Sequence, residues 1–133
     1  MRLWHYDLIP VLPNKMLISQ WRECIAIKRQ WEKGTLKHRL VSYVMDYNKD
    51  YFLHYVYCIT EELYNRNINF NKKYLNEIIN FIGHDKVELL YYKEHNDRYL
   101  KQCYYNLQEK ADRGIITKEE WEKIEDLFKS EVE

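Results

Sequence analysis

The stretch that decides the fold is NKMLISQWRECIAIKRQW, residues 14–31. Its apolar side chains recur at spacings of three and four residues, which is the period that places them on one face of an α-helix. This face is formed by Leu17, Trp21, Cys24, Ile25 and Lys28, with Met16, Ile18 and Ile27 widening it. The pattern predicts an amphipathic helix that buries one side against the rest of the chain.

Polar residues lie at the start and along the edge of this helix. Pro13 has no N–H group and fixes φ, so we expect the helix to begin after it, with Asn14 as its N-cap. Arg22 and Glu23 are adjacent and therefore project about 100° apart beside the apolar face. One interpretation is an ordinary solvated pair, and the other is a cation and a carboxylate held where water is partly excluded.

The remaining sequence predicts further helices and no strand. Met1–Pro13 is expected to run extended, because its two prolines prevent a helix from continuing. Caps and glycines divide the chain after the first helix into helical segments at about 40–47, 48–65, 72–82, 86–95, 96–113 and from 117 onward, with Asn48 and Asn96 as N-caps and Thr117 with Glu120 as a capping box. The expected fold class is all-α, a compact multi-helix bundle with an extended N-terminal segment, forming one domain over residues 1–133.

Cysteine usage and hydropathy exclude several classes of protein. Cys24, Cys58 and Cys103 are odd in number and far apart, so they form neither a disulfide framework nor a CxxC zinc site. No apolar run is long enough to cross a membrane, and the N-terminal stretch contains a histidine and an aspartate, unlike a signal peptide. We therefore expect a cytoplasmic protein that does not bind membranes.

Basic residues gather in one part of the chain, although the net charge is zero. Residues 15–39 hold seven Lys or Arg against two Asp or Glu. Such a surplus suits a nucleic acid, whose phosphates supply most of the non-specific affinity, but a neutral protein can also show an asymmetry of this size by chance. The candidate DNA-binding residues are Arg2, Lys15, Lys28, Arg29, Lys33, Lys37, His38 and Arg39.

Two further features have a plain interpretation beside a functional one. The thirteen tyrosines and four tryptophans could stack on unpaired bases, but we expect most of them to pack in the core. His84 and His95, with Asp85 and Glu94, could ligate a metal, but they lack the i, i+4 histidine pair of a helical zinc site. We expect them to be surface residues, and we expect no metal and no cofactor.

A set of residues in the first half of the chain matches the pattern of a known family. They are Met1–His5, Leu8–Leu12, Leu17, the triplet Trp21-Arg22-Glu23, Tyr51-Phe52 and Glu62–Asn67. In these residues, and in the spacing from the chain start to Arg22-Glu23, the sequence resembles the small pyrimidine-dimer DNA glycosylase/AP lyase family known from a bacteriophage. It is more similar still to uncharacterised bacterial relatives that begin with a stretch like MRLWHYDLIPVLP, and with these alone it shares Glu94–Asp97 and Tyr99–Lys101.

The resemblance implies a chemistry for the chain start. In that family the terminal α-amine attacks the anomeric carbon of a damaged nucleotide, the base leaves and a Schiff base forms. An α-amine has a pKa near about 8, so a part of it is the neutral nucleophile at neutral pH. A glutamate matching Glu23 assists and promotes the elimination that nicks the strand, and an arginine matching Arg22 binds phosphate. The candidate catalytic residues are therefore Met1, Glu23 and Arg22, and the implied partner is double-stranded DNA with damaged bases.

Three positions depart from the family pattern. Removal of the initiator methionine is not expected before a residue as large as Arg2, so the acting amine would be that of Met1. Ala26 stands where the family has a basic residue, and Met16 stands where it has a histidine that His5 could replace in space.

The leading interpretation is a base excision repair enzyme, a DNA glycosylase with AP lyase activity on pyrimidine dimers or a related lesion. The alternative is a catalytically inactive nucleic-acid-binding module of the same fold. A protein-interaction module built on the tyrosine-rich surface has no specific support, and nothing in the sequence sets the oligomeric state.

Overall fold

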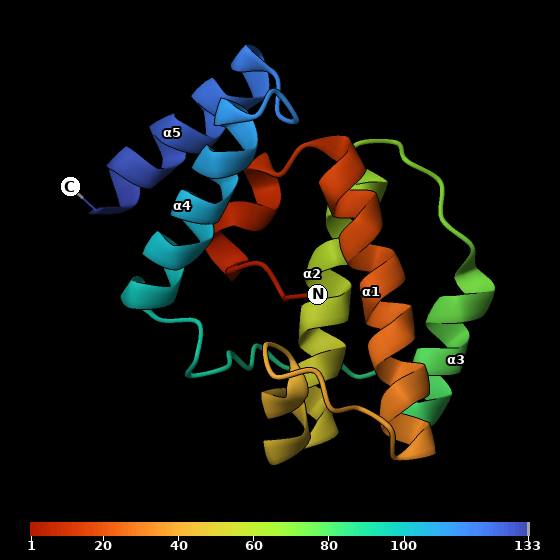
Figure 1. The fold of residues 1–133 in the computed structure, drawn as a ribbon. Helices are drawn as coiled ribbons and strands as arrows, with labels where there is room; N and C mark the ends of the chain where they lie inside the picture. Colours follow the sequence, from red (N-terminus) through yellow and green to blue (C-terminus); the bar gives the residue numbers. More distant parts are fainter. Residues whose placement is uncertain (133) are drawn as a thin grey trace.

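The computed structural model describes residues 1–132 and confirms the all-α fold class, with no strand in that range (Figure 1). Two short 3-10 helices and five α-helices follow one another along the chain. They are η1 (Tyr6–Val11), α1 (Asn14–Lys33), η2 (Ser42–Asp46), α2 (Lys49–Asn65), α3 (Lys72–Ile82), α4 (Asp97–Asp112) and α5 (Lys118–Val132).

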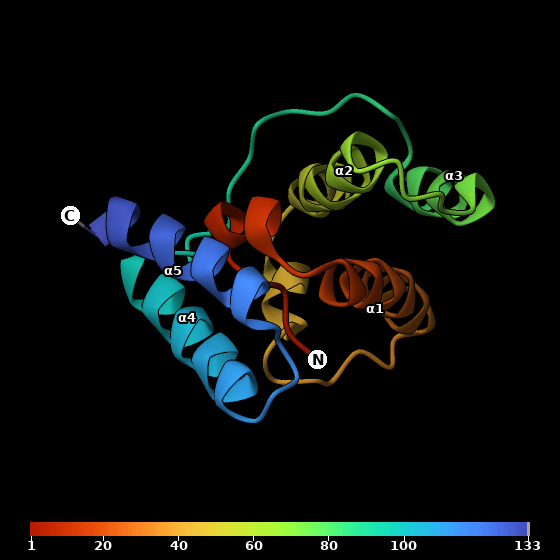
Figure 2. The same ribbon diagram turned by 90° about the horizontal axis from the view of Figure 1, so that it is seen from above.

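The helices form two groups joined by the N-terminal segment. Helices α1, α2 and α3 pack against one another on one side of the molecule, and α4 packs against α5 on the other (Figures 1 and 2). Helix η1 contacts both α2 and α5 and so lies between the groups. The first residues of the chain consequently run through the interior of the fold, and leucine at position 3 is fully buried.

Side-chain caps define most of the helix N-termini, and the sequence predicted those of α2, α4 and α5. Asn48 and Asn96 each accept a hydrogen bond from a backbone N–H group in the first turn of α2 and α4. Thr117 and Glu120 bond reciprocally at the start of α5, which is the expected capping box. The prediction for α1 was wrong by one residue, because Pro13 occupies the N-cap position and makes no side-chain bond.

Two other expectations about local structure were wrong. The N-terminal segment is not extended throughout, because residues 6–11 form η1, where the Asp7 N–H group donates to His5 Nδ1. Residues 86–95 do not form a helix. The backbone of that segment bonds to other parts of the chain instead of forming helical hydrogen bonds. The Leu90 carbonyl lies 2.7 Å from His54 Nδ1, and the Tyr92 N–H group donates to the Tyr6 hydroxyl.

Aromatic and imidazole rings fill the space between the two helix groups. His95 lies at the centre of this cluster, with the rings of Tyr6 and Tyr99 at 4.7 and 4.9 Å between centroids. The Tyr43 hydroxyl is 2.7 Å from His95 Nε2, while Nδ1 is buried and has no hydrogen-bond partner among residues 1–132. The expectation that His95 lies at the surface was therefore wrong, and burial lowers the pKa of its imidazole to about 3.

No helix in the part of the chain that the structure describes is long and apolar enough to cross a membrane.

Burial of neutral His95 should make the fold sensitive to acid. Because the unfolded chain binds a proton at pH values where folded His95 does not, the free energy of unfolding should fall as pH drops from about 6.5 toward 3, by a few kcal/mol. His95→Gln should flatten this fall. Urea unfolding at several pH values measures this dependence of stability on pH. Near neutral pH the imidazole is neutral in both states, so the difference in the free energy of unfolding between the two proteins there gives the packing cost of the substitution alone. Parallel curves for the two proteins would contradict this role.

Candidate active site

A buried amide on α1 holds the start of the chain. Gln20 is fully buried, and its Oε1 accepts a hydrogen bond of 2.7 Å from the Trp4 N–H group. Its Nε2 donates to the Arg2 carbonyl and to Glu23 Oε2, both at 2.9 Å. One side chain thus fixes the N-terminal backbone and the carboxylate of Glu23 relative to each other.

Two tyrosines from other helices complete this attachment. The hydroxyl of Tyr55 on α2 lies 2.7 Å from the Trp4 carbonyl and 3.0 Å from Gln20 Oε1. The hydroxyl of Tyr99 on α4 donates to the Leu3 carbonyl at 2.6 Å. Helices α1, α2 and α4 therefore all bind the backbone of residues 2–4, and the N-terminus is fixed in position.

The terminal amine emerges from this attachment beside a half-buried carboxyl. Met1 N lies 3.4 Å from His38 Nε2, in the loop between α1 and η2. Burial raises the pKa of Glu23, while the charge of the terminal amine, the Arg2 N–H group and Gln20 act to lower it, and the net direction is upward. The charge of the amine thus contributes to the pKa of the Glu23 carboxyl, although the described residues show no direct ion pair between the two groups.

Glu23 opens into a small pocket. This pocket has a volume of about 180 Å³ and is lined by Trp4, Met16, Ser19, Gln20, Glu23 and Lys110. Lys110 belongs to α4, and sequence reasoning missed it because nothing in the local pattern of that helix distinguishes it from other lysines. Gln20 and Tyr55 were missed as well, since their role depends on bonds between helices. The pocket therefore brings together the Glu23 carboxyl, whose pKa is raised, and the primary amine of Lys110.

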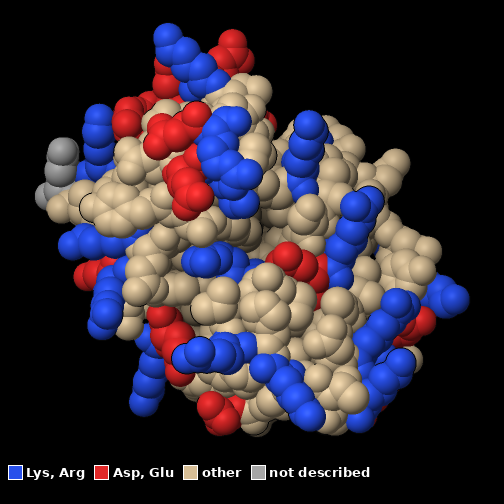
Figure 3. All heavy atoms as spheres, viewed as in Figure 1, with Lys and Arg blue, Asp and Glu red and all other residues tan. Residues whose placement is uncertain are grey.

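Basic side chains surround the chain start. Figure 3 shows Lys and Arg over α1 and the loop after it, with acidic atoms at the centre of the same face. Among the candidate DNA-binding residues, Lys33, Lys37, His38 and Arg39 are exposed at the end of α1 and in this loop. These four positions are therefore free to approach a polyanion from the side on which the chain begins.

The other candidate residues lie elsewhere or are occupied. Arg22 lines a separate groove of about 230 Å³, where Trp21 and Phe70 supply apolar walls. Lys28 is only 8% exposed and bonds to Glu32 at 3.1 Å, so it is not available at the surface. Arg29 reaches Glu77 and the ring of Tyr74 on α3. Lys15 borders a pocket that it shares with α5. The guanidinium of Arg2 lies over the ring of Trp4.

His5 does not replace the family histidine. Met16 lines the pocket of Glu23, but the ring of His5 packs against His95 and Tyr99 in the aromatic cluster. Its Nδ1 accepts a hydrogen bond from the Asp7 N–H group. The expectation that His5 takes this place was therefore wrong, because η1 turns its side chain inward.

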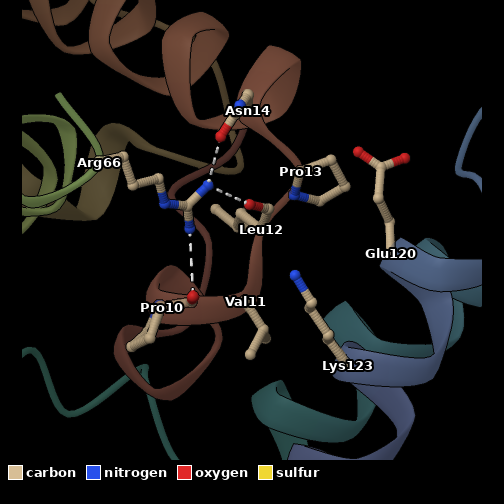
Figure 4. Close-up of a pocket in the computed structure, with 8 residues that line it drawn as sticks. All are labelled: Pro10, Val11, Leu12, Pro13, Asn14, Arg66, Glu120 and Lys123. Carbon is tan, nitrogen blue, oxygen red and sulfur yellow. Dashed lines mark hydrogen bonds between the residues drawn. The ribbon is translucent and has the colours of Figure 1, made fainter. Parts of the chain in front are cut away.

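A larger pocket of about 320 Å³ shares no lining residue with the pocket of Glu23. Figure 4 shows its main polar group, Arg66, with its guanidinium directed at the turn between η1 and α1. Arg66 donates to the carbonyls of Ile9, Pro10 and Leu12 and to Asn14 Oδ1. These bonds occupy the guanidinium, so this residue positions the turn that leads into α1.

The part of the chain that the structure describes contains no group of three or more His, Cys, Asp or Glu side chains that could hold a metal ion.

Comparison with known proteins gives one match. A family model described as pyrimidine dimer DNA glycosylase matches residues 1–76, which is more than half of the chain. This range contains Met1, Gln20, Glu23, His38 and Tyr55, whereas Tyr99 and Lys110 lie beyond it. No curated protein and no solved structure matches the chain.

Removal of the Gln20 amide should destabilise the whole fold. Gln20→Ala leaves the buried Trp4 N–H group and Arg2 carbonyl without partners, so the free energy of unfolding should fall by about 3 kcal/mol. Urea denaturation measures this loss. Gln102→Ala, which removes the same amide from an exposed site on α4, is the matched control and should change the stability little. Equal effects of the two substitutions would show that Gln20 does not hold the chain start.

The raised pKa of Glu23 should make the stability of a variant depend on pH. The folded protein holds the carboxyl proton more tightly than the unfolded chain does, so ionisation of Glu23 lowers the stability as pH rises above about 4.3. Glu23→Gln removes this cost, and its stability relative to the parent should increase between about pH 4 and pH 7. Thermal unfolding across that range measures the difference. A difference that stays constant with pH would contradict the raised pKa.

Proposed function

Because the chain belongs to the pyrimidine dimer DNA glycosylase family, we propose that it is a DNA-repair enzyme that removes a base from a pyrimidine dimer or a related lesion and then nicks the strand by AP lyase chemistry. In this proposal the nucleophile is the α-amine of Met1, Glu23 is the acid-base group, and the substrate is double-stranded DNA.

The observation that carries the proposal is the attachment of the chain start beside Glu23. A free terminus normally frays, so a reaction at its amine needs the backbone to be held in place. Here Gln20, Tyr55 and Tyr99 bind residues 2–4, and the charge of the amine acts on the carboxyl. A carboxyl with a raised pKa keeps its proton to a higher pH than a free glutamate does, and such a shift suits a group that takes part in acid-base catalysis.

The proposed reaction proceeds in two stages. The lone pair of the Met1 nitrogen forms a bond to C1′ of the damaged nucleotide while the bond from C1′ to the base breaks and the base leaves with its electron pair. Glu23 accepts the proton that the new secondary amine gives up and returns it to O4′ as the C1′–O4′ bond breaks, while the nitrogen lone pair forms the C1′=N bond of the Schiff base. Loss of a proton from C2′ then expels the 3′ phosphate and leaves a nicked strand.

The basic side chains around the chain start would bind the DNA backbone. Lys33, Lys37 and Arg39 lie exposed on this face, and Lys110 borders the pocket itself. Neutralised phosphates release counterions, so binding through these residues should weaken as the salt concentration rises. Lys28 is left out of this surface because it is buried and paired with Glu32. Arg22 would contact DNA from the neighbouring groove.

Borohydride trapping on a duplex with an abasic site tests the proposal. The parent protein should form a covalent adduct, and mass mapping should place it on the N-terminal peptide. Glu23→Gln should slow adduct formation about a hundredfold or more, as expected for loss of an acid-base group. Glu61→Gln, an exposed glutamate on α2, is the matched control and should behave as the parent.

Three other outcomes would change the conclusion. An adduct on Lys110 in place of Met1 would move the nucleophile to the other amine of the site. Full trapping after acetylation of the N-terminus would exclude the α-amine. Salt-sensitive binding of the duplex with no adduct would mean that the protein is a binding module of the same fold.

A further inference from the structure

We propose that Ile115 is an apolar wedge that enters the base stack of the DNA beside the nucleotide under attack. The inference rests on the proposed function, because it assigns a task to a residue at the edge of the candidate active site. The sequence gave Ile115 no role, and the family model matches only residues 1–76. The structure shows a large apolar side chain that is 54% exposed on the turn between α4 and α5.

The backbone of this turn fixes the position of Ile115. Its N–H group donates to the Lys110 carbonyl at 3.0 Å. The Gly114 N–H group donates to the Ala111 carbonyl at the same distance. These two bonds form a Schellman motif, which needs the left-handed backbone that Gly114 adopts at φ 77°. The next residue, Ile116, is buried, so Ile115 is held between two anchored helix ends.

The same motif explains why Ile115 has no apolar partner at the end of α4. In a Schellman motif the residue at this position frequently packs against an apolar side chain five or six residues before it. Here those residues are Lys110 and Glu109, which are both charged. The side chain of Lys110 lines the pocket of Glu23 instead. Ile115 is therefore left exposed at a fixed place beside that pocket.

Ile115 adjoins the candidate active site from the α4–α5 side. It lines a pocket of about 150 Å³ together with Met16 of α1, and Met16 also lines the pocket of Glu23. Figures 1 and 2 show the turn between α4 and α5 near the N-terminal end of α1, on the side of the molecule where the chain begins. A DNA strand bound at the Glu23 pocket therefore runs close to Ile115.

Basic side chains around the turn suit a DNA backbone. They are Lys15, Lys110, Arg113 and Lys118. The acidic residues of residues 110–120 are Asp112, Glu119 and Glu120. Glu120 shares the pocket of Ile115, but its Oε1 already accepts a hydrogen bond from the Thr117 N–H group. Phosphates can therefore pair with lysine or arginine on both sides of an apolar tip.

An apolar wedge performs a task that the proposed reaction needs. An enzyme cannot reach its target atom inside a stacked duplex, so the nucleotide has to leave the stack. Proteins insert isoleucine and other apolar side chains between base steps, and the inserted side chain replaces part of the lost stacking contact. Isoleucine is branched at Cβ and has few rotamers to lose when it inserts. Ile115 thus has the chemistry, the position and the rigidity of a wedge.

Fluorescence of the DNA tests the wedge without any chemical step. The duplex carries 2-aminopurine, which is quenched by stacking, next to a tetrahydrofuran abasic analogue that cannot form a Schiff base. Saturating parent protein should raise the fluorescence several-fold, and Ile115→Ala should give less than about half of that gain. Ile115→Leu should restore most of the gain, because leucine also serves as a wedge.

A matched control removes an apolar side chain from another surface. Leu89 is 75% exposed and belongs to the segment between α3 and α4, which lies on the side opposite the chain start (Figure 2). Leu89→Ala should give the fluorescence gain of the parent. A parent-like gain in Ile115→Ala would overturn the proposal, as would equal losses in Ile115→Ala and Leu89→Ala.

Borohydride trapping separates a wedge from a general contact with DNA. A nucleotide in a single strand is not locked in a duplex, so its sugar can be reached without a wedge. Ile115→Ala should slow adduct formation on an abasic duplex about tenfold and leave the rate on the abasic single strand unchanged. The unchanged rate would also show that the variant is folded. Equal losses on both DNAs would overturn the proposal.

The two assays distinguish this proposal from the proposed function. If the fluorescence gain depends on Ile115 but no protein forms an adduct, the wedge stands and the glycosylase proposal fails. If the parent forms the adduct and Ile115→Ala matches it in both assays, the function stands and the wedge is refuted. A parent protein that gives no fluorescence gain on the duplex also refutes the wedge.

Discussion

The buried side-chain amide of Gln20 is the constraint on which the rest of the site depends. A buried amide must satisfy its donors and its acceptor, because each unpaired group costs about 1–3 kcal/mol. Gln20 satisfies them with the Trp4 N–H group, the Arg2 carbonyl and Glu23. The requirement for hydrogen bonds in the core therefore also positions the chain start beside a carboxyl, so the stability of the fold and the geometry of the site have one physical cause.

The electrostatics of the site follow from its partial burial. Burial raises the pKa of Glu23 even though the terminal amine acts in the opposite direction, so desolvation is the larger effect. Burial is also the larger effect in the aromatic cluster, where it lowers the pKa of His95 and the neighbouring His5 acts in the same direction. Around these groups exposed basic side chains lie on the face where the chain begins, with acidic side chains among them (Figure 3).

The two helix groups contribute unequally to this arrangement. The family model covers residues 1–76, which include η1, α1 and α2 with the amine, the carboxyl and the amide that connects them. Helix α4 lies outside this range and supplies Tyr99, which binds the Leu3 carbonyl, and Lys110, which completes the pocket. The group formed by α4 and α5 thus adds one hydrogen bond to the chain start and one wall of the pocket, whereas the rest of the site belongs to η1, α1 and α2.

Local chemistry in the sequence was enough to predict most of the helices. The three- and four-residue spacing of Leu17, Trp21 and Cys24 defines a buried face, and Asn48 and Asn96 cap helices because their oxygens reach the free N–H groups of the next turn. The family pattern also marks Glu23 as a candidate from the sequence alone, since that pattern depends on spacing along the chain.

Contacts between distant segments determined the rest. Residues 86–95 have a helical pattern but do not form a helix, because their backbone makes hydrogen bonds to His54 and Tyr6. Lys28 appears basic and available in the sequence, yet it is buried against Glu32, while His38 and Lys110 become members of the site only when a loop and α4 approach the terminus. Helix periodicity and caps act over a few residues and can be read locally, whereas burial, protonation and the position of the chain start depend on which distant segments pack together.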